Sequence, residues 1–441
     1  MPDLQNLQEP GGADKCCAGS VCICQMMQAR RRKVLRLPVS FVFLQERRMR
    51  KFRTDGKRMH KTAVFFSVLI LGAALLTGCG KKTEPPQESE TQTKQETVSA
   101  TEQAKANETG AVTNTQQAAL VENDGQHSYA YRRKKVDPEQ VKQRPLAVML
   151  NNILEGCPQT GTSKASIIYE APVEGRITRL MGLFENYGDM DKIGYIRSSR
   201  DYFVYCALEF DAIYAHFGQA TPYVGELLNS DRVDNISGPV AGINHPAPNT
   251  FLRTTERKMP HNVYLDIKGL QKDIDKMKYS RTYHDAHKPK FAFAADGQKP
   301  DNSKGKTAEM LYPGGKEKDQ PNGYSKVQAW FEYNEEDGKY YRYQYGGPHI
   351  DESTGEQLAF DNVIFQYCYG EVRDENDYLA FGCHGDNGMK VQVFTQGKMT
   401  EGTWSRYADT DPAYYVDENG DPIVLSQGKT LDLPDLGSVC G

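Results

Sequence analysis

The residues best suited to chemistry stand together in the segment Arg197–Asp201, which reads R-S-S-R-D. The apolar residues 193–196 before it predict a strand, and residues 202–210 after it have helical spacing. Free backbone N–H groups and the positive end of a helix dipole favour an anion at such a turn. Guanidinium groups add bidentate recognition of carboxylate or phosphate. We therefore expect Arg197, Ser198, Arg200 and Asp201 to bind an anionic group.

A purely structural interpretation uses the same residues. Ser198 or Ser199 would cap the helix, Asp201 would complement its dipole, and the arginines would pair with Glu170 or Glu174. The sequence leaves both interpretations open. Further candidate binding residues are Asn151, Arg179, His216, His261 and Asn262.

Two carboxylates, Glu170 and Glu174, lie four residues apart around Pro172 and close to Arg179 in the chain. They could act as the acid and base of a glycoside hydrolase if they stood about 5–9.5 Å apart. Carboxylates near several arginines more often stabilise a fold. A cell-wall hydrolase therefore remains an alternative, and the sequence favours a role without catalysis.

Three histidines, His216, His245 and His261, could ligate zinc, but no H-x-x-x-H or H-E-x-x-H spacing supports this. The sequence therefore predicts no metal site and no cofactor. Four residues are expected either to line the same groove as the Arg197–Asp201 segment or to brace a loop before Tyr264: Arg253, Arg257, His261 and Asn262.

The cysteines of the expected folded part are odd in number, which predicts no complete disulfide framework. They are Cys157, Cys206, Cys368, Cys383 and Cys440. Whether Cys368 pairs with Cys383 stays open. The run F-G-C-H-G (381–385) allows a Cys/His nucleophile, although a buried or paired thiol is favoured. The acidic run D-E-N-G-D (417–421) predicts a hairpin turn rather than a calcium site.

The elements expected to position these residues fall into two groups. Strands at 145–150, 166–170, 177–184, 193–196 and 212–216, with helices at 202–210 and 223–229, predict an α/β module. Strands at 324–330, 340–345, 362–369, 391–394 and 413–416, with turns at 337–338, 387–388 and 419–420, predict a mainly antiparallel β module. The predicted fold class is thus an α/β module followed by an α+β module rich in β structure.

The beginning of the chain predicts an export signal. Residues 62–76 carry no charge and follow Lys57, Arg58 and Lys61, which is typical of a signal peptide. The next residues, L-T-G-C (76–79), resemble the bacterial lipobox, which implies lipidation of Cys79. An ordinary cleavage site is the alternative. Met59 or Met49 suits such a signal better than Met1, so the cysteine cluster at 16–24 is interpreted as part of a mis-assigned start rather than a zinc site.

Charge also separates the beginning of the chain from the remainder. Residues 1–62 hold 14 Lys and Arg against 5 Asp and Glu, a net charge of +9 within a total of −4, so the remainder carries −13. Such an acidic remainder argues against nucleic acid as a partner. Residues 81–126 are polar and predict a flexible tether. The expected parts are 1–58, a mis-assigned start or an extension of the n-region; 59–78, the signal peptide; 79–140, the lipidated cysteine and tether; and modules at 141–302 and 303–441.

Several motifs resemble the YerB-like lipoproteins of Gram-positive bacteria, a family of unknown function. They are R-P-L-A-V-M-L-N-N (144–152), Y-E-A-P-V-E-G-R-I-T-R (169–179), I-G-Y-I-R-S-S-R-D-Y (193–202), P-H-N-V-Y (260–264), Y-Y-R (340–342), H-I-D (349–351), D-N-V-I (361–364), G-K-M-T-E-G-T-W (397–404) and G-K-T (428–430). The resemblance implies a fold and a surface location, but no reaction. Residues 431–436 are less apolar than the strand that the family pattern places there, so no firm strand is expected.

These observations predict a lipoprotein on the outer face of the cytoplasmic membrane, anchored through Cys79. Its expected partners are the membrane and an anionic small molecule or cell-wall component. A purely structural envelope scaffold is a further alternative, and the sequence predicts no oligomeric state.

Overall fold

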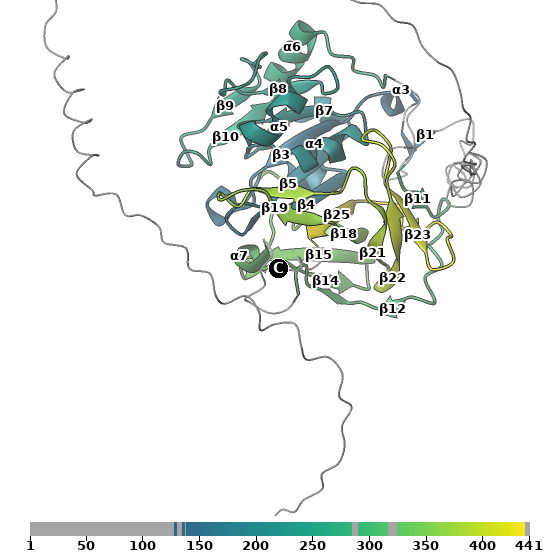
Figure 1. Ribbon diagram of the computed structural model, residues 1–441. Helices are drawn as coiled ribbons and strands as arrows, with labels where there is room; N and C mark the ends of the chain where they lie inside the picture. The colour runs from purple at the N-terminus through teal and green to yellow at the C-terminus, as the bar shows by residue number, and fades with distance from the viewer. Residues whose placement is uncertain (1–127, 130–134, 137, 285–289, 316–323, 437–441) are drawn as a thin grey trace, which may run out of the picture. The chain divides into compact units, whose positions relative to one another are not determined.

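The computed structural model describes residues 128–129, 135–136, 138–284, 290–315 and 324–436. The predicted signal peptide, Cys79, Cys440 and residues 81–126 of the tether lie outside these ranges. All described residues belong to one compact unit, residues 94–441. They form a mostly β structure with few helices (Figure 1). No helix among them is long and apolar enough to cross a membrane.

Eleven strands form one large mixed sheet. They are β3 (Leu146–Leu150), β4 (Ile167–Val173), β5 (Ile177–Phe184), β7 (Ile213–His216), β8 (Asn235–Ser237), β12 (Lys306–Thr307), β18 (Asn362–Cys368), β21 (Asn387–Thr395), β22 (Lys398–Ser405), β23 (Tyr414–Asp417) and β25 (Thr430–Leu436). Their order is β12-β22-β21-β18-β25-β4-β5-β3-β7-β8, with β23 beside β22. The sheet therefore contains strands from both halves of the described chain.

Smaller sheets and short helices surround this sheet. One sheet has three strands, β6 (Lys192–Gly194), β10 (Val263–Asp266) and β9 (Phe251–Arg253). Another has five, β13 (Met310–Leu311), β14 (Trp330–Asn334), β15 (Lys339–Gln344), β16 (Gly347–Pro348) and β17 (Ala359–Phe360). The remaining sheets are pairs: β1 (Ser128–Tyr129) with β2 (Lys135–Val136), β11 (Ala292–Phe293) with β24 (Val424–Leu425), and β19 (Gly370–Val372) with β20 (Leu379–Phe381). The helices are α3 (Pro138–Val141), α4 (Asp201–Leu208), α5 (Thr221–Leu228), α6 (Ile267–Met277) and α7 (Tyr324–Val327), with 3-10 turns η2 (Leu154–Gly156), η3 (Thr162–Lys164) and η4 (Tyr187–Asp189).

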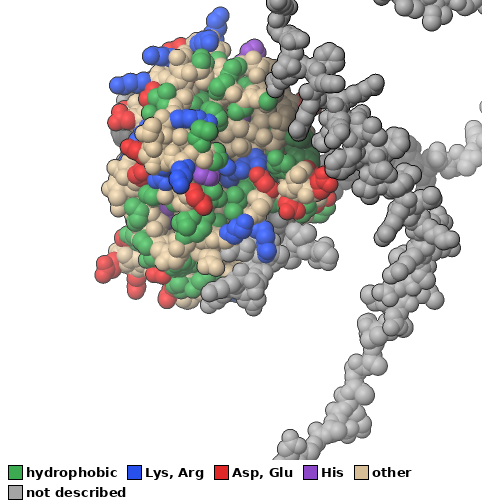
Figure 2. Space-filling view, turned by 90° about the vertical axis from the view of Figure 1, so that its left-hand side faces the viewer, with side chains coloured by type: hydrophobic (Ala, Val, Ile, Leu, Met, Phe, Trp, Pro, Cys, Tyr) green, Lys and Arg blue, Asp and Glu red, His purple; other side chains and the backbone are tan. Residues whose placement is uncertain are grey.

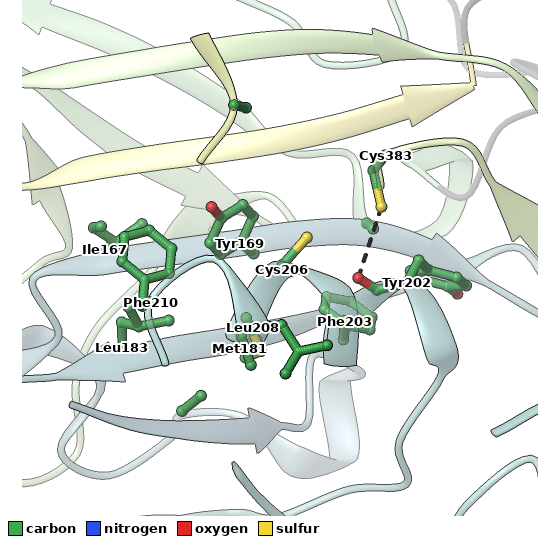
Figure 3. Packing of buried hydrophobic residues seen from close by; sticks show 14 of the residues in the cluster. Ile167, Tyr169, Met181, Leu183, Tyr202, Phe203, Cys206, Leu208, Phe210 and Cys383 are labelled. Carbon is green, nitrogen blue, oxygen red and sulfur yellow. Dashed lines mark hydrogen bonds between the residues drawn. The ribbon is translucent and has the colours of Figure 1, made fainter. Parts of the chain in front are cut away.

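Both faces of the large sheet are buried at its centre. Successive side chains of a strand point to opposite faces, and in β3 all five residues are buried. Ala147 and Met149 pack on one face with α4, whereas Leu146 and Val148 pack on the other. Figure 3 shows the first face, where residues of α4 such as Phe203 lie against residues of β4 and β5. This two-sided burial explains why β3 reads as a continuous apolar run rather than an alternating one.

Mixed pairing characterises the N-terminal half. Strands β3, β7 and β8 are parallel, and α4 and α5 precede β7 and β8 in the chain, whereas β5 is antiparallel to both β3 and β4. The strands and helices expected there are found close to their predicted positions. The classification of this half as a separate α/β module and the boundaries 141–302 and 303–441 stay predictions.

The last strand corrects one expectation. Residues 431–436 were not expected to form a firm strand, yet β25 lies between β4 and β18 and is parallel to both. Leu431 and Leu433 are buried on one face, and Asp432 is buried as well. The ladder with β4 covers only Thr430–Asp432, so Pro434, which has no N–H to donate, lies beyond it. Tertiary pairing outweighs the weak local pattern.

Two other local predictions are wrong. Residues 324–327 form α7 rather than a strand, because Tyr324 and Val327 bury themselves at helical spacing. The pair Asn387–Gly388 lies inside β21 instead of a hairpin turn. There the register shifts between Asn387 and Met389, and Gly388 supplies the positive φ of a bulge. The turns at 337–338 and 419–420 are confirmed.

Candidate functional site

The segment after β6 crosses the carboxyl ends of β3 and β7. The backbone N–H of Asn151 donates to the carbonyl of Tyr195 at 2.8 Å, and that of Arg197 donates to Met149 at 3.0 Å. The N–H of Phe217, just after β7, donates to the carbonyl of Arg197 at 3.1 Å. These bonds hold Arg197 where two parallel strands end, an edge of a sheet that commonly carries ligand sites.

The structure pairs two guanidinium groups with one carboxylate, and the guanidinium group of Arg197 is close enough to interact with them electrostatically. Arg200 donates from Nε to Oε2 of Glu174 at 2.9 Å and also pairs through Nη2, while Arg179 Nη2 lies 3.2 Å from Oε1. Arg179 and Arg200 are buried, and the Glu174 side chain is 26 % exposed. Burial would raise the pKa of Glu174, but the two arginines outweigh it and lower that pKa. We call Arg179, Arg197, Arg200 and Glu174 the Arg197 site.

Arg197 differs from the other two arginines. It is half-buried, and no carboxylate of the described residues lies within ion-pair distance of it. Its Nη1 lies 3.5 Å from the carbonyl of Pro260. Burial and the charge of Arg200 both lower the pKa of Arg197. Three guanidinium groups facing one carboxylate leave an excess of positive charge, which suits an anionic ligand.

A polar rim lies beside Arg197. The Asn151 amide donates to His261 Nδ1 at 3.0 Å, which leaves the other ring nitrogen of His261 available as a donor. Burial and then Arg197 lower the pKa of His261. Asn262 braces the loop between residues 254 and 262, because its amide donates to the carbonyl of Thr254 and its oxygen accepts from Arg253 at 2.7 Å. Figure 2 shows Lys and Arg side chains gathered around a histidine on the face that lies to the left in Figure 1.

Serines do not cap α4. The cap position is held by Arg200 in extended conformation and without a side-chain cap bond. The Ser199 hydroxyl is instead 2.8 Å from the hydroxyl of Tyr214, and the Ser198 carbonyl accepts from Arg179 at 2.8 Å. The expectation of a serine cap is therefore wrong. In this extended turn, Ser199 contacts β7 through its hydroxyl, and Ser198 contacts Arg179 through its backbone carbonyl.

Asp201 and His216 are held in structural contacts next to the Arg197 site. Asp201 pairs with Arg373 at 2.5 Å, and His216 is fully buried. The ring nitrogens of His216 lie 2.7 Å from the Gly218 carbonyl and 2.9 Å from the Asn235 side-chain oxygen. Burial lowers the pKa of His216 to about 4. His216 is therefore not available to a ligand from solvent, and Asp201, whose side chain is 12 % exposed, is engaged by Arg373.

Glu170 lies deep inside the protein rather than beside Glu174. Its carboxylate accepts from Arg342 at 2.6 Å and from Thr178 at 2.7 Å, and the side chains of Glu170 and Arg342 are completely buried. A carboxylate sealed in this way cannot reach a polymer substrate. The lowered pKa of Glu174 likewise suits an ionised partner of arginine rather than a general acid. No observation favours the hydrolase alternative.

Sequence reasoning missed the residues that tie Glu170 to the second half of the chain. In β15 alternate residues are buried, so Arg342 falls on the inner face between Tyr340 and Gln344. The period-two alternation of this strand could have placed Arg342 inside. Arg342 Nη1 then donates to Nδ1 of His349 at 2.8 Å, because a guanidinium group carries only donors.

The cysteines do not form a nucleophile site. Cys206, Cys368 and Cys383 are buried and belong to no disulfide, so Cys368 and Cys383 are not joined to each other. The thiol of Cys383 donates to the carbonyl of Tyr202 at 3.7 Å (Figure 3). The pKa of Cys383 is raised: the contact with Cys206 favours the thiolate, but burial and the neighbouring Cys368 together outweigh it. A buried thiol of this kind is inert.

The described residues contain no group of ligands suited to a metal ion. In the acidic run at 417–421, Asp417 accepts from the backbone N–H of Asn419 at 2.8 Å and of Asp421 at 3.0 Å. These bonds close the turn after β23, as the sequence predicted.

Comparison with known proteins identifies two successive domains. Residues 133–280 match the model described as the N-terminal domain of a protein of unknown function (DUF3048), and residues 321–431 match its C-terminal domain. The Bacillus subtilis (strain 168) protein named "Putative lipoprotein YerB" is 27% identical over 299 residues, which is 67% of this chain and 80% of that protein. The crystal structure of YerB from Bacillus subtilis has a TM-score of 0.56 at 24% identity and covers 69% of this chain and 96% of that chain. The resemblance predicted from the sequence is confirmed.

Proposed function

We propose that this chain, which belongs to the YerB-like family defined by the two DUF3048 domains, is a lipid-anchored envelope protein whose Arg197 site binds an anionic group. The anchor would be the lipidated Cys79, and the folded part would stand outside the cytoplasmic membrane. The anion would be a phosphate or carboxylate of a cell-wall polymer, a peptide or a lipid head group.

The anchor is supported by the lipobox-like L-T-G-C at 76–79 and by the name of the Bacillus subtilis relative. Replacing Cys79 by Ala should move the protein from the membrane fraction to the soluble exported fraction, because the acyl chains supply the membrane affinity. Cys157→Ala is the matched control and should stay in the membrane fraction. Full membrane retention of Cys79→Ala would contradict the anchor.

Anion binding is carried by one observation: Arg197 is a half-buried guanidinium with no carboxylate partner among the described residues. Its neighbours Arg179 and Arg200 are held in place by Glu174, so these two guanidinium groups are preorganised. A preorganised guanidinium loses little freedom when it forms two parallel bonds to an oxyanion.

The test uses two probes, polyglycerol phosphate and vesicles containing phosphatidylglycerol. Arg197→Ala should weaken binding of the preferred probe at least about tenfold, since a charge-assisted hydrogen bond contributes about 1.5–3 kcal/mol. Arg281→Ala removes the same charge from a surface pair with Asp275 and should leave binding unchanged. Equal affinity of wild type and Arg197→Ala for both probes would refute the proposed site.

Preference between the probes distinguishes the two sources of phosphate. Binding to polyglycerol phosphate but not to the vesicles would indicate a wall polymer, and the reverse would indicate a lipid head group. Binding should also weaken as salt concentration rises, because the half-exposed guanidinium is screened.

A further inference from the structure

A second charged group lies far from the surface, in the core between the two halves. Lys290, two residues before β11 begins, places Nζ 3.0 Å from Oε2 of Glu209 and 3.1 Å from Oδ2 of Asp432. Glu209 follows α4 and Asp432 is in β25, and Arg406 also pairs with Glu209 at 3.1 Å. The side chains of all four are at most 1 % exposed. We call Lys290, Glu209, Asp432 and Arg406 the Lys290 cluster.

Aromatic rings enclose the amine. Lys290 Nζ lies 4.9–5.8 Å from the ring centres of Tyr169, Phe210, Phe291 and Tyr415. Figure 3 shows two of these rings, Tyr169 and Phe210, on the packed face of the sheet. The Tyr169 hydroxyl accepts from Nζ at 2.6 Å. A wall of this kind keeps bulk water away from the amine and the two carboxylates.

Asp432 is incompletely satisfied. Its Oδ2 accepts from the hydroxyl of Tyr415 at 2.9 Å and from Lys290, whereas its Oδ1 is buried and has no hydrogen-bond partner among the described residues. A buried carboxylate oxygen without a partner is costly. Burial also raises the pKa of Asp432, which favours the protonated acid.

We propose that Lys290 and Asp432 condense to an intramolecular amide, with Glu209 as the proton carrier. Such a bond needs a buried amine, a carboxyl group in contact with it, and a third group that moves protons. In the Lys290 cluster, Glu209 and Asp432 each lie within hydrogen-bond distance of Lys290 Nζ.

The step begins from the ammonium and carboxylate pair. The carboxylates outweigh burial in setting the raised pKa of Lys290, so one proton must first pass from Nζ to Oδ2 of Asp432, to which Nζ already donates a hydrogen bond at 3.1 Å. The neutral amine then attacks Cγ of Asp432. A second proton moves from nitrogen through Glu209 to the departing oxygen, and the C–O bond breaks. The products are one amide, which keeps the third hydrogen, and one water molecule; no oxidant or other reactant is needed.

The arrangement favours condensation over a permanent ion pair in one more respect. Lys290 and Asp432 carry opposite charges, so their loss leaves Arg406 and Glu209 as a balanced buried pair. The amide would also join residues 142 positions apart and fasten β25, the strand that lies between β4 and β18. A cross-link over so long a loop restricts the unfolded chain strongly.

The test is a tryptic digest of the full-chain protein after denaturation, read by mass spectrometry. Trypsin should fail to cleave after Lys290, and the peptide containing Lys290 should be joined to the peptide that begins at Thr430. The combined mass should equal the sum of the two peptides less one water molecule. Complete cleavage after Lys290, with a separate unmodified peptide beginning at Thr430, would overturn the proposal.

Two variants separate the roles. Lys290→Arg keeps the positive charge but removes the nucleophile, so trypsin should cleave fully after position 290 and no joined peptide should appear. This control is independent of folding because the digest is made on denatured protein. Glu209→Gln should lower the joined fraction at least about tenfold; an unchanged fraction would overturn the assignment of Glu209 as proton carrier.

Discussion

The Arg197 site and the Lys290 cluster use the same kinds of side chain under opposite conditions. In the Arg197 site three guanidinium groups face one carboxylate, and Arg197 is only half-buried. Before the proposed condensation, the Lys290 cluster has two cations that face two carboxylates, and the four side chains are almost completely sealed from solvent. The first group has unmatched charge at the surface, and the second has matched charge in the core.

The difference shows how burial selects the role of a charge. A buried charge without a partner costs several kcal/mol, so the core accepts only a balanced set. An exposed or half-exposed charge costs little by itself and remains free to attract a ligand. The same distinction explains why Glu170 is a structural residue and Glu174 lies at the edge of a candidate binding site.

The largest effect is expected from removing Glu209. Glu209→Ala would leave Lys290 and Arg406 buried with only Asp432 as a carboxylate, and breaking a buried pair costs about 3–5 kcal/mol of unfolding free energy. Urea denaturation would measure the loss. Glu401→Ala is the matched control, because Glu401 pairs with Lys306 and Lys390 at the surface, and it should change stability by less than about 0.5 kcal/mol. Equal losses in both variants would abolish the contrast between core and surface charge.

The next effect concerns pH and His216, which lies beside the Arg197 site but is buried like the Lys290 cluster. Its folded pKa is about 4 against an ordinary 6.5, so the unfolded state binds the proton more tightly. Stability from this group is therefore complete above pH 6.5 and is lost as pH falls toward 4, by about 3 kcal/mol at 1.36 kcal/mol per pKa unit.

Denaturation curves of wild type and His216→Asn at several pH values would measure this loss. The difference between the two proteins isolates His216, because other titrating groups are common to both. Parallel stability curves from pH 7 to pH 4 would show that folding does not change the pKa of His216. His216 would then take up its proton in the folded protein like a solvent-accessible residue.

The smallest effect should separate two arginines inside the Arg197 site. Arg200→Ala removes two charge-assisted bonds to Glu174 and should cost about 2 kcal/mol, whereas Arg197→Ala should change stability by less than about 0.5 kcal/mol. Thermal melts of the two variants would measure this order. A large loss for Arg197→Ala would show that Arg197 braces the fold, which would favour the structural interpretation of the segment.

Local patterns predicted most of the elements near the site. Apolar runs placed β3, β5 and β7, and helical spacing placed α4 and α5. The prediction failed where the decisive contact was distant: residues 324–327 became α7, and β25 formed from a weakly apolar run. Strand propensity depends on the neighbouring strands, so a central position in a sheet can create a strand that its own residues do not predict.

For the candidate site, the sequence by itself determined the concentration of arginines at 197–200, their place between a strand and a helix, and the carboxylates nearby. Only the tertiary structure decided which carboxylate serves the arginines, since Glu174 pairs with Arg200 while Glu170 pairs with Arg342, 172 residues away. The meeting of Lys290 with Asp432 was equally invisible. Residue type and period are local properties of a chain, whereas burial and charge pairing depend on which distant strands become neighbours.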